Sequence, residues 1–225
     1  MTTVAPTTLA AIGGARVNAN MASILRGLKA RANGLERPER LMHYLGQLAH
    51  ESGSFRFDHE IWGPTPAQTR YEGRADLGNI HPGDGFKFRG RGVAQITGRA
   101  NYRDFTAWAR AIDPAAPDFT EDPDAILTDP WEGLAPIWFW QTRNLNLLAD
   151  QGDIEGITRR INGGQNGLQA RIDLTGRAGA VLFGLKSVRE FQQYHALTPD
   201  GVFGPITRRA MHGILCRLPA VTFTL

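Results

Sequence analysis

The chain has 225 residues, of which 42% are hydrophobic and 21% charged, and its formal net charge is +3. These proportions are typical of a globular protein with one large domain, or with one ordinary domain and a small appendage. No run approaches the ~18 consecutive apolar residues of a membrane helix, so we expect no stable membrane insertion. The six histidines show no HxxxH or HExxH spacing, and Cys216 is the single cysteine. We therefore expect no metal, no cofactor and no internal disulfide.

The excess positive charge is confined to the C-terminal end. Residues 181–225 contain five of the 25 basic residues and only two of the 22 acidic ones, so residues 1–180 are neutral. A basic terminal segment favours a polyanionic partner such as nucleic acid, a membrane surface or a bacterial wall. A solvated surface with a chance surplus of charge is the alternative.

The predicted elements begin with a polar start and then a helix over residues 20–32. A second helix begins at Pro38 and ends before Gly53, and its leucines at 41, 45 and 48 have the spacing of an amphipathic helix. Residues 54–98 are rich in glycine, proline, arginine and aromatic residues without long periodicity. Long irregular segments of this kind are often functional.

Further helices are predicted over residues 101–112, 131–148, 153–161 and 167–183, and a Pro- and Asp-rich connection occupies 113–130. The aromatic-rich helix 131–148 is expected in the core. The order contains no alternation of strand and helix, so the predicted fold class is mainly α.

Glu51 is the first candidate for catalysis because of its place at the end of the second helix. At 100° per residue it points within roughly 20° of Tyr44 and about 60° from Leu48, at the border of the apolar face. A carboxyl group half-buried against apolar side chains resists ionisation, as a general acid working near neutral pH requires. An exposed helix-end glutamate is the alternative interpretation.

Glycoside hydrolysis uses a second carboxylate opposite the acid, and two candidates follow in the irregular segment. These are Glu60 and Glu72, each of which taken singly is equally consistent with a surface charge or an arginine partner.

The segment 85–102 combines glycines with the neutral hydrogen-bonding side chains of Gln95, Thr97 and Asn101. Neutral donors and acceptors beside aromatic residues suit a sugar. The Arg-Gly-Arg-Gly string at 89–92 also occurs in RNA-binding tails, but here it is a single copy followed by apolar alternation. We therefore favour carbohydrate over nucleic acid, and no phosphate-binding glycine loop is present.

Three blocks of the sequence, in this order, resemble the signature of glycoside hydrolase family 19: residues 50–53, 88–102 and 161–164. Residues 70–74 and 77–79 resemble the phage and prophage endolysin branch of that family more than plant chitinases. The resemblance covers roughly residues 15–180.

The resemblance implies a helical, bilobed, lysozyme-like domain that hydrolyses β-1,4 links between N-acetylated aminosugars. It implies that Glu51 is the general acid and that Thr97 helps to hold the attacking water. Endolysin-branch sequences place the second carboxylate near Glu60 and plant chitinases nearer to Glu72, and we prefer Glu60. The substrate-binding positions that we predict are Tyr71, Glu72, Arg74, Gln95, Asn101, Asn162 and Arg171.

Residues 188–211 resemble a small helical peptidoglycan-binding module, in which Asp200-Gly201 forms a turn and Phe191 packs in the core. We therefore predict a catalytic domain over 1–180 and a shortened wall-binding module over 181–225. A helical extension without a binding role is the alternative.

Both resemblances point to bacterial peptidoglycan, so the leading hypothesis is an endolysin that lyses its host. A chitinase and a non-catalytic wall-binding protein are the alternatives. The N-terminal residues show no secretion signal, which favours an enzyme that stays in the cytoplasm until a partner permeabilises the membrane. A monomer is the default expectation for a wall hydrolase.

Overall fold

The computed structural model describes residues 2–61, 63 and 65–225. Within them lie strands β1 (Thr3–Val4) and β2 (Thr222–Phe223), the 3-10 helices η1 (Ala75–Leu77) and η2 (Pro123–Leu127), and the following α-helices: α1 (Pro6–Gly13), α2 (Ala19–Arg31), α3 (Pro38–Glu51), α4 (Pro66–Thr69), α5 (Asp84–Lys87), α6 (Arg99–Ile112), α7 (Trp131–Thr142), α8 (Leu145–Asp150), α9 (Ile154–Asn162), α10 (Leu168–Leu182), α11 (Val188–Tyr194) and α12 (Pro205–Leu215). The mainly α fold class is confirmed. None of the described helices has the length and the apolar run that a membrane crossing requires.

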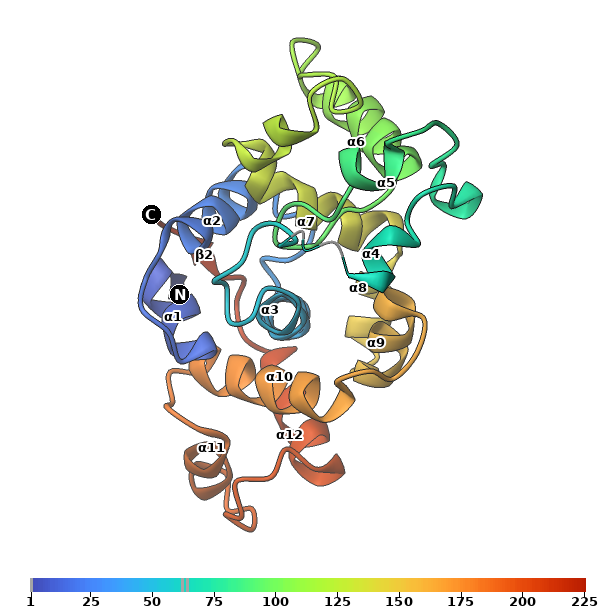
Figure 1. Cartoon of the computed structure of the whole chain (residues 1–225). Helices are drawn as coiled ribbons and strands as arrows, with labels where there is room; N and C mark the ends of the chain where they lie inside the picture. Colours follow the sequence, from blue (N-terminus) through green and yellow to red (C-terminus); the bar gives the residue numbers. More distant parts are fainter. Residues whose placement is uncertain (1, 62, 64) are drawn as a thin grey trace.

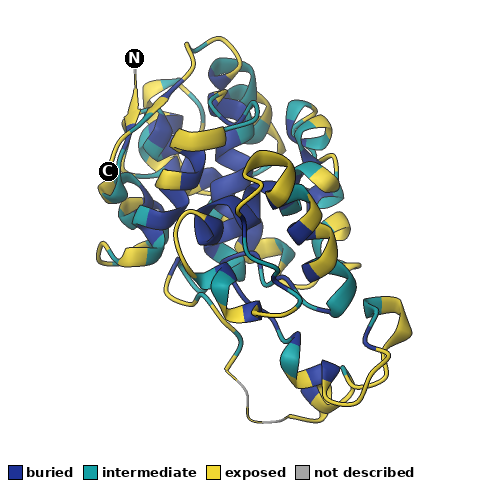
Figure 2. Cartoon of the chain, turned by 90° about the horizontal axis from the view of Figure 1, so that it is seen from above, coloured by how far each residue is buried: buried dark blue, intermediate teal, exposed yellow. Residues whose placement is uncertain are grey.

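Helix α3 is the centre of the fold. Figure 1 shows it end-on, with α1, α7, α9 and α10 arranged around it, and Figure 2 shows the buried residues concentrated in the middle of the molecule. The amphipathic pattern predicted a helix with one buried face, but polar residues such as His43 and Gln47 are buried as well. The neighbouring helices cover α3 on all sides, and local periodicity does not reveal this.

Two glycines allow helices of this core to approach closely. A Cβ atom at Gly46 of α3 would lie 2.5 Å from the Thr175 hydroxyl of α10, and one at Gly27 of α2 would lie 2.1 Å from the carbonyl oxygen of Gly133 on α7. Real Cβ atoms do not approach other atoms so closely, so alanine at either position would force the paired helices apart.

The helices predicted over 20–32, 38–53, 101–112, 153–161 and 167–183 correspond to α2, α3, α6, α9 and α10. The prediction of one continuous helix over 131–148 was wrong. The chain turns at Asn144, whose φ is +51°, and this separates α7 from α8. Asparagine is one of the few residues that adopt this left-handed conformation readily.

The polar start predicted before residue 20 contains a helix, α1, that we did not predict. Pro6 stands at its first position, Leu9 and Ile12 are fully buried, and Gly14 ends it at a φ of +63°. Eight residues give too short an apolar period to detect, although the proline and glycine at its ends are a recognisable helix signal.

Residues 54–98 contain only the short helices α4, η1 and α5 among their described positions, in agreement with the predicted irregular segment. Isolated antiparallel bridges join His59 to Arg91 and Arg91 to Ile96. These bridges fasten the segment that follows α3 to the glycine-rich segment, and so bring together two parts of the predicted site.

The C-terminal residues 181–225 pack onto the helical body. Strand β2 pairs in parallel with β1, and a Cβ atom at Gly176 of α10 would lie 2.5 Å from the Phe203 ring. The predicted turn at Asp200-Gly201 is held by Gln192, which donates to the Asp200 carboxylate at 2.7 Å and accepts from the Gly201 N–H at 2.8 Å. A separate binding role for these residues, and a boundary at residue 180, stay predictions.

The buried His43 predicts how stability depends on pH. Burial, together with the charges of the nearby His212 and Arg208 of α12, lowers its pKa to about 3. Between pH ~6.5 and ~3 the unfolded chain binds a proton that the folded chain does not, so stability falls as pH falls, by at most about 1.4 kcal/mol per pH unit. We expect His43→Leu to reduce this slope.

Urea unfolding at several pH values between about 6.5 and about 5, where most carboxylates stay ionised, measures that slope. The carboxylates are the same in both proteins, so the difference between the two slopes reports His43. Parallel slopes for wild type and His43→Leu would contradict the assignment.

Candidate active site

Glu51 is the last residue of α3, and its side chain is 25% exposed. Arg171 of α10 is its ionic partner, with Nη2 at 2.5 Å from Glu51 Oε1, but the contact does not have the direction of a hydrogen bond. The sequence predicted an apolar surface beside this carboxyl group. The structure instead places the buried guanidinium of Arg171 there. Arg171 belongs to α10, which begins 117 positions after Glu51.

Arg171 is fixed in place by neutral acceptors. Its side chain is 3% exposed, Nη1 donates to Gln47 Oε1 at 2.6 Å, and Nε donates to the backbone carbonyl of Asn166 at 3.2 Å. Asn162 Nδ2 donates to the same carbonyl at 3.0 Å. The loop between α9 and α10 is therefore tied to the end of α3 through Arg171. The predicted residues Asn162 and Arg171 share the Asn166 carbonyl as acceptor, and Arg171 pairs with Glu51 by charge.

Glu51 opens onto a hollow of about 260 Å³. The side chains around it come from the end of α3 and the segment after it, and from the glycine-rich segment: Glu51, Phe57, His59, Ile61 and Gln95. Phe57 and Ile61 are 48% and 72% exposed, so the hollow has an unusual amount of uncovered apolar surface. Apolar walls with a few convergent polar groups are the usual composition of a small-molecule site, and they fit the C–H faces and hydroxyls of a sugar ring.

Glu60 is the residue between His59 and Ile61, two of the residues that line the hollow, although it is not part of the lining itself. Gln68 Nε2 donates to Glu60 Oε1 at 3.0 Å, and the Gly90 N–H donates to Oε2 at 3.2 Å. Burial raises the pKa of the Tyr71 hydroxyl, and the charge of Glu60 and a hydrogen bond to it raise that pKa further. The predicted residues Glu60 and Tyr71 are therefore neighbours, and the carboxylate of Glu60 faces neutral donors.

Gln95, Thr97 and Asn101 form a connected group on the glycine-rich segment. Gln95 has a φ of +51°, and a Cβ atom at Gly90 would lie 2.5 Å from Gln95 Oε1 and 3.3 Å from the Thr97 hydroxyl. A larger residue at position 90 would therefore displace the Gln95 side chain from this position. Thr97 Oγ1 donates to the Gln95 carbonyl at 3.0 Å, and Asn101 Nδ2 donates to the Thr97 carbonyl at 2.7 Å.

Glu72 and Arg74 do not lie around the hollow. Both carboxylate oxygens of Glu72 are occupied, since they accept from the backbone N–H groups of Gly83 at 2.7 Å and Gly85 at 2.8 Å. Arg74 forms a two-pronged ion pair with Asp76 at 2.6 and 2.5 Å. In this structure Glu72 supports the loop before α5, and Glu60 is the carboxylate beside the hollow.

Several residues of the site were not predicted. Gln47 lies one helical turn before Glu51 on the same face of α3, which is a signal that the sequence contained. Phe57 and His59 follow Glu51 closely, but nothing in their spacing marked them. The ring of His50 contacts Gly167, burial lowers its pKa, the charge of Arg171 lowers it further, and Glu51 opposes both effects.

Among the described residues, no group of three or more His, Cys, Asp or Glu side chains is placed to hold a metal ion. The polar side chains that line the hollow are a carboxylate, an amide and an imidazole, and the guanidinium of Arg171 lies against the carboxylate. These groups supply proton transfer, charge stabilisation and hydrogen bonding, which are the requirements of glycoside hydrolysis by two carboxylates.

No family model matches the chain. A glycosyl hydrolase family 19 domain-containing protein of Haemophilus influenzae is 33% identical over 159 residues, covering 58% of this chain and 74% of that protein. An endochitinase of Arabidopsis thaliana is 32% identical over 157 residues, covering 69% of this chain, and this chain spans 48% of its length. The first of these relationships shows that the chain belongs to glycosyl hydrolase family 19, and it is a glycosidase.

The solved structures agree at the level of the fold. Chitinase C of Streptomyces griseus matches with a TM-score of 0.62 at 17% identity, over 80% of this chain and 76% of that one. A bacterial family 19 chitinase matches with a TM-score of 0.62 at 18% identity, over 88% of this chain and 98% of that one. The predicted lysozyme-like helical fold of this family is therefore confirmed.

Proposed function

We propose that this glycosidase hydrolyses the β-1,4 bonds of bacterial peptidoglycan, with Glu51 as the general acid. The observation that carries the assignment of the acid is the position of Glu51, half-exposed on a hollow with uncovered apolar walls. Glu51 Oε1 is buried against Arg171 Nη2, so Oε2 is the oxygen that would face a glycosidic oxygen.

Of the other residues, some act on the attacking water and the rest contact the sugars. Glu60 is the second carboxylate, and Thr97 helps to hold the attacking water. If the reaction inverts the anomeric centre, the two carboxyl groups of the bound enzyme should stand ~6.5–9.5 Å apart with the water between them. Tyr71, Gln95, Asn101 and Asn162 contact the polymer, and Arg171 orients Glu51 through their ion pair.

Peptidoglycan is favoured over chitin by the C-terminal residues 181–225. They carry the whole excess of positive charge, and they contain the turn at Asp200-Gly201 that resembles a wall-binding module. Peptidoglycan bears carboxylates on its peptides, whereas chitin is neutral. Chitin is nevertheless the second candidate, because the named plant relative is an endochitinase.

The biological setting that fits a peptidoglycan glycosidase of this branch is host lysis by a phage. In this proposal the enzyme is a monomeric endolysin, stays in the cytoplasm of the producing cell, and reaches the wall when a membrane-permeabilising partner acts. Release of mature enzyme from cells that lack any phage partner would contradict this setting.

Turbidity measurements on two polymers test the substrate. We expect the wild-type enzyme to clear a suspension of purified Gram-negative sacculi and to act weakly on colloidal chitin under the same conditions. Activity on chitin alone would assign the protein to the chitinases and overturn the proposal. Activity on neither polymer would leave a family member that binds the wall without cleaving it.

A further inference from the structure

A second hollow, of about 450 Å³, lies between the helical body and the C-terminal residues. It is bounded by α1 and α10 on one side and by the start of α11 on the other, and its lining includes Arg177, Lys186, Arg189 and Asp173, together with the buried ring of Phe203. We call it the basic cleft. It is separate from the hollow at Glu51, with which it shares no lining residue.

The three cations of the basic cleft have no acidic partner among the described residues. Arg177 Nη1 donates to the backbone carbonyl of Ile12 at 3.3 Å, and Arg189 Nη2 donates to that of Asp200 at 3.1 Å. Arginines elsewhere in the chain, such as Arg40 and Arg99, are paired with carboxylates. The lining contains one acid, Asp173, whose hydrogen-bond partner is the neutral Gln169 at 2.8 Å. Three cations against one carboxylate leave the lining of the cleft with a net positive charge.

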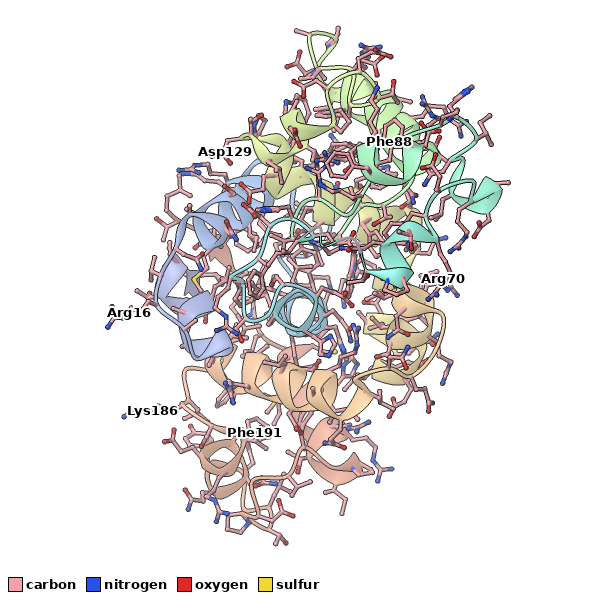
Figure 3. All side chains as sticks on the ribbon, in the orientation of Figure 1. Arg16, Arg70, Phe88, Asp129, Lys186 and Phe191 are labelled. Atoms are coloured by element: carbon pink, nitrogen blue, oxygen red, sulfur yellow. The ribbon has the colours of Figure 1, made fainter. Side chains whose placement is uncertain are left out.

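The positive surface continues from the basic cleft toward the catalytic hollow. A further hollow of about 340 Å³ is lined by Gly14, Arg16, Ser54 and Arg56 among others. Arg177 joins the two, because a Cβ atom at Gly14 would lie 3.3 Å from its Nη1 atom. Ser54 stands three positions after Glu51. Figure 3 shows Arg16 and Lys186 projecting outward along the same margin of the molecule.

We propose that the basic cleft binds the carboxylates of the peptides attached to the wall glycan, while the glycan itself occupies the hollow at Glu51. This inference rests on the proposed function and adds a second point of contact to it. Guanidinium groups match carboxylates in geometry as well as in charge. A peptide-bearing glycan presents sugars and carboxylates on one polymer, which is the combination that the two hollows and the cations between them fit.

The basic cleft draws on both parts of the chain and uses two of the five cations of residues 181–225. Lys186 and Arg189 come from that segment and Arg177 from the helical body. The C-terminal residues therefore complete a site on the catalytic body. This arrangement differs from an independent module that binds the wall on its own.

Binding to purified sacculi tests the basic cleft. The measurement is co-sedimentation, with every protein carrying Glu51→Gln so that the polymer is not digested. We expect Arg177→Gln, Lys186→Gln and Arg189→Gln together to weaken binding roughly tenfold, since exposed charge pairs contribute modestly and add over three positions. Because the contacts are ionic, the difference should shrink at high salt.

The matched control neutralises three exposed cations outside the basic cleft, Lys29, Arg209 and Arg217, and should bind as the Glu51→Gln parent does. Thermal melting checks that both triple variants are folded. The double variant Lys186→Gln with Arg189→Gln leaves Arg177 in contact with α1, so it separates loss of binding from disturbance of that helix. It should reproduce most of the effect.

Sacculi whose carboxylates have been converted to amides provide the control on the ligand. On them the cleft variant and the parent should bind equally. If the cleft variant and the parent bind untreated sacculi equally, or if their difference persists on amidated sacculi, the proposed role of the basic cleft is overturned. The proposed function would stay intact. Tighter binding to phosphatidylglycerol vesicles through the same cations would make the occupant a lipid surface instead. A parent that does not bind sacculi would remove the proposed function and this inference together.

Discussion

Glu51→Gln is expected to reduce hydrolysis of peptidoglycan by a factor of ~10²–10⁴, the usual contribution of a positioned acid. Glutamine keeps the shape of the side chain and its contact with Arg171, but it cannot donate a proton to the leaving oxygen. The effect should appear in the rate of hydrolysis at saturating polymer, because the change removes a step of the reaction and leaves the hollow intact.

The fold of this variant should be unchanged, since Glu51 is part-exposed and forms no hydrogen bond through Oε1. Far-UV circular dichroism and a thermal melt provide the check. Rapid lysis of sacculi by a folded Glu51→Gln protein would sink the assignment of the acid, and an unfolded protein would require the shorter change to aspartate as a second test.

Substitution of Glu60 and of Glu72 is expected to show which of the two is the second catalytic carboxylate. Glu60→Gln should lower the rate of hydrolysis by a factor of the same order, ~10²–10⁴, because Glu60 lies beside the hollow with donors that hold it in place. Glu72→Gln should leave most of the activity. It replaces one of two acceptors for the Gly83 and Gly85 N–H groups, so its effect should be a loss of stability of about 1 kcal/mol.

Parallel measurement of turnover and of urea unfolding on both variants distinguishes these roles. Each variant loses one acceptor and should lose a similar amount of stability, so the predicted difference is in turnover, which Glu60→Gln loses and Glu72→Gln largely keeps. If Glu72→Gln loses turnover and Glu60→Gln retains it, the loop before α5 must rearrange when the polymer binds, and our assignment of the second carboxylate is wrong.

Local features of the sequence predicted the elements of this fold well. The leucine spacing of α3, the proline that opens it and the glycine that follows it placed Glu51 at a helix end, and the structure has it there. The glycine-rich segment was predicted as irregular, and it is. Helix α1 and the break at Asn144 were missed because one is short and the other depends on a single left-handed residue.

The chemical surroundings of Glu51 could not be predicted in the same way. The partner of its carboxylate, Arg171, is 120 positions later in the chain, and only the packing of α10 on α3 brings the two together. An argument from neighbouring apolar residues on one helix therefore predicted the partial burial correctly and the nature of the neighbour incorrectly. Likewise, counting along the sequence could not decide between Glu60 and Glu72, whereas in the structure Glu60 is next in the chain to two residues of the hollow and Glu72 supports the loop before α5.

The measurement that tests the account most directly is a count of new chain ends after digestion of purified sacculi. Hydrolysis of a glycosidic bond creates a reducing sugar end, whereas cleavage of the wall peptides creates a free amino group. We predict that wild type raises the number of reducing ends, leaves free amino groups unchanged, and loses this activity in Glu51→Gln. New amino groups without reducing ends, or reducing ends produced equally by Glu51→Gln, would contradict the assignment of this chain as a peptidoglycan glycosidase that works through Glu51.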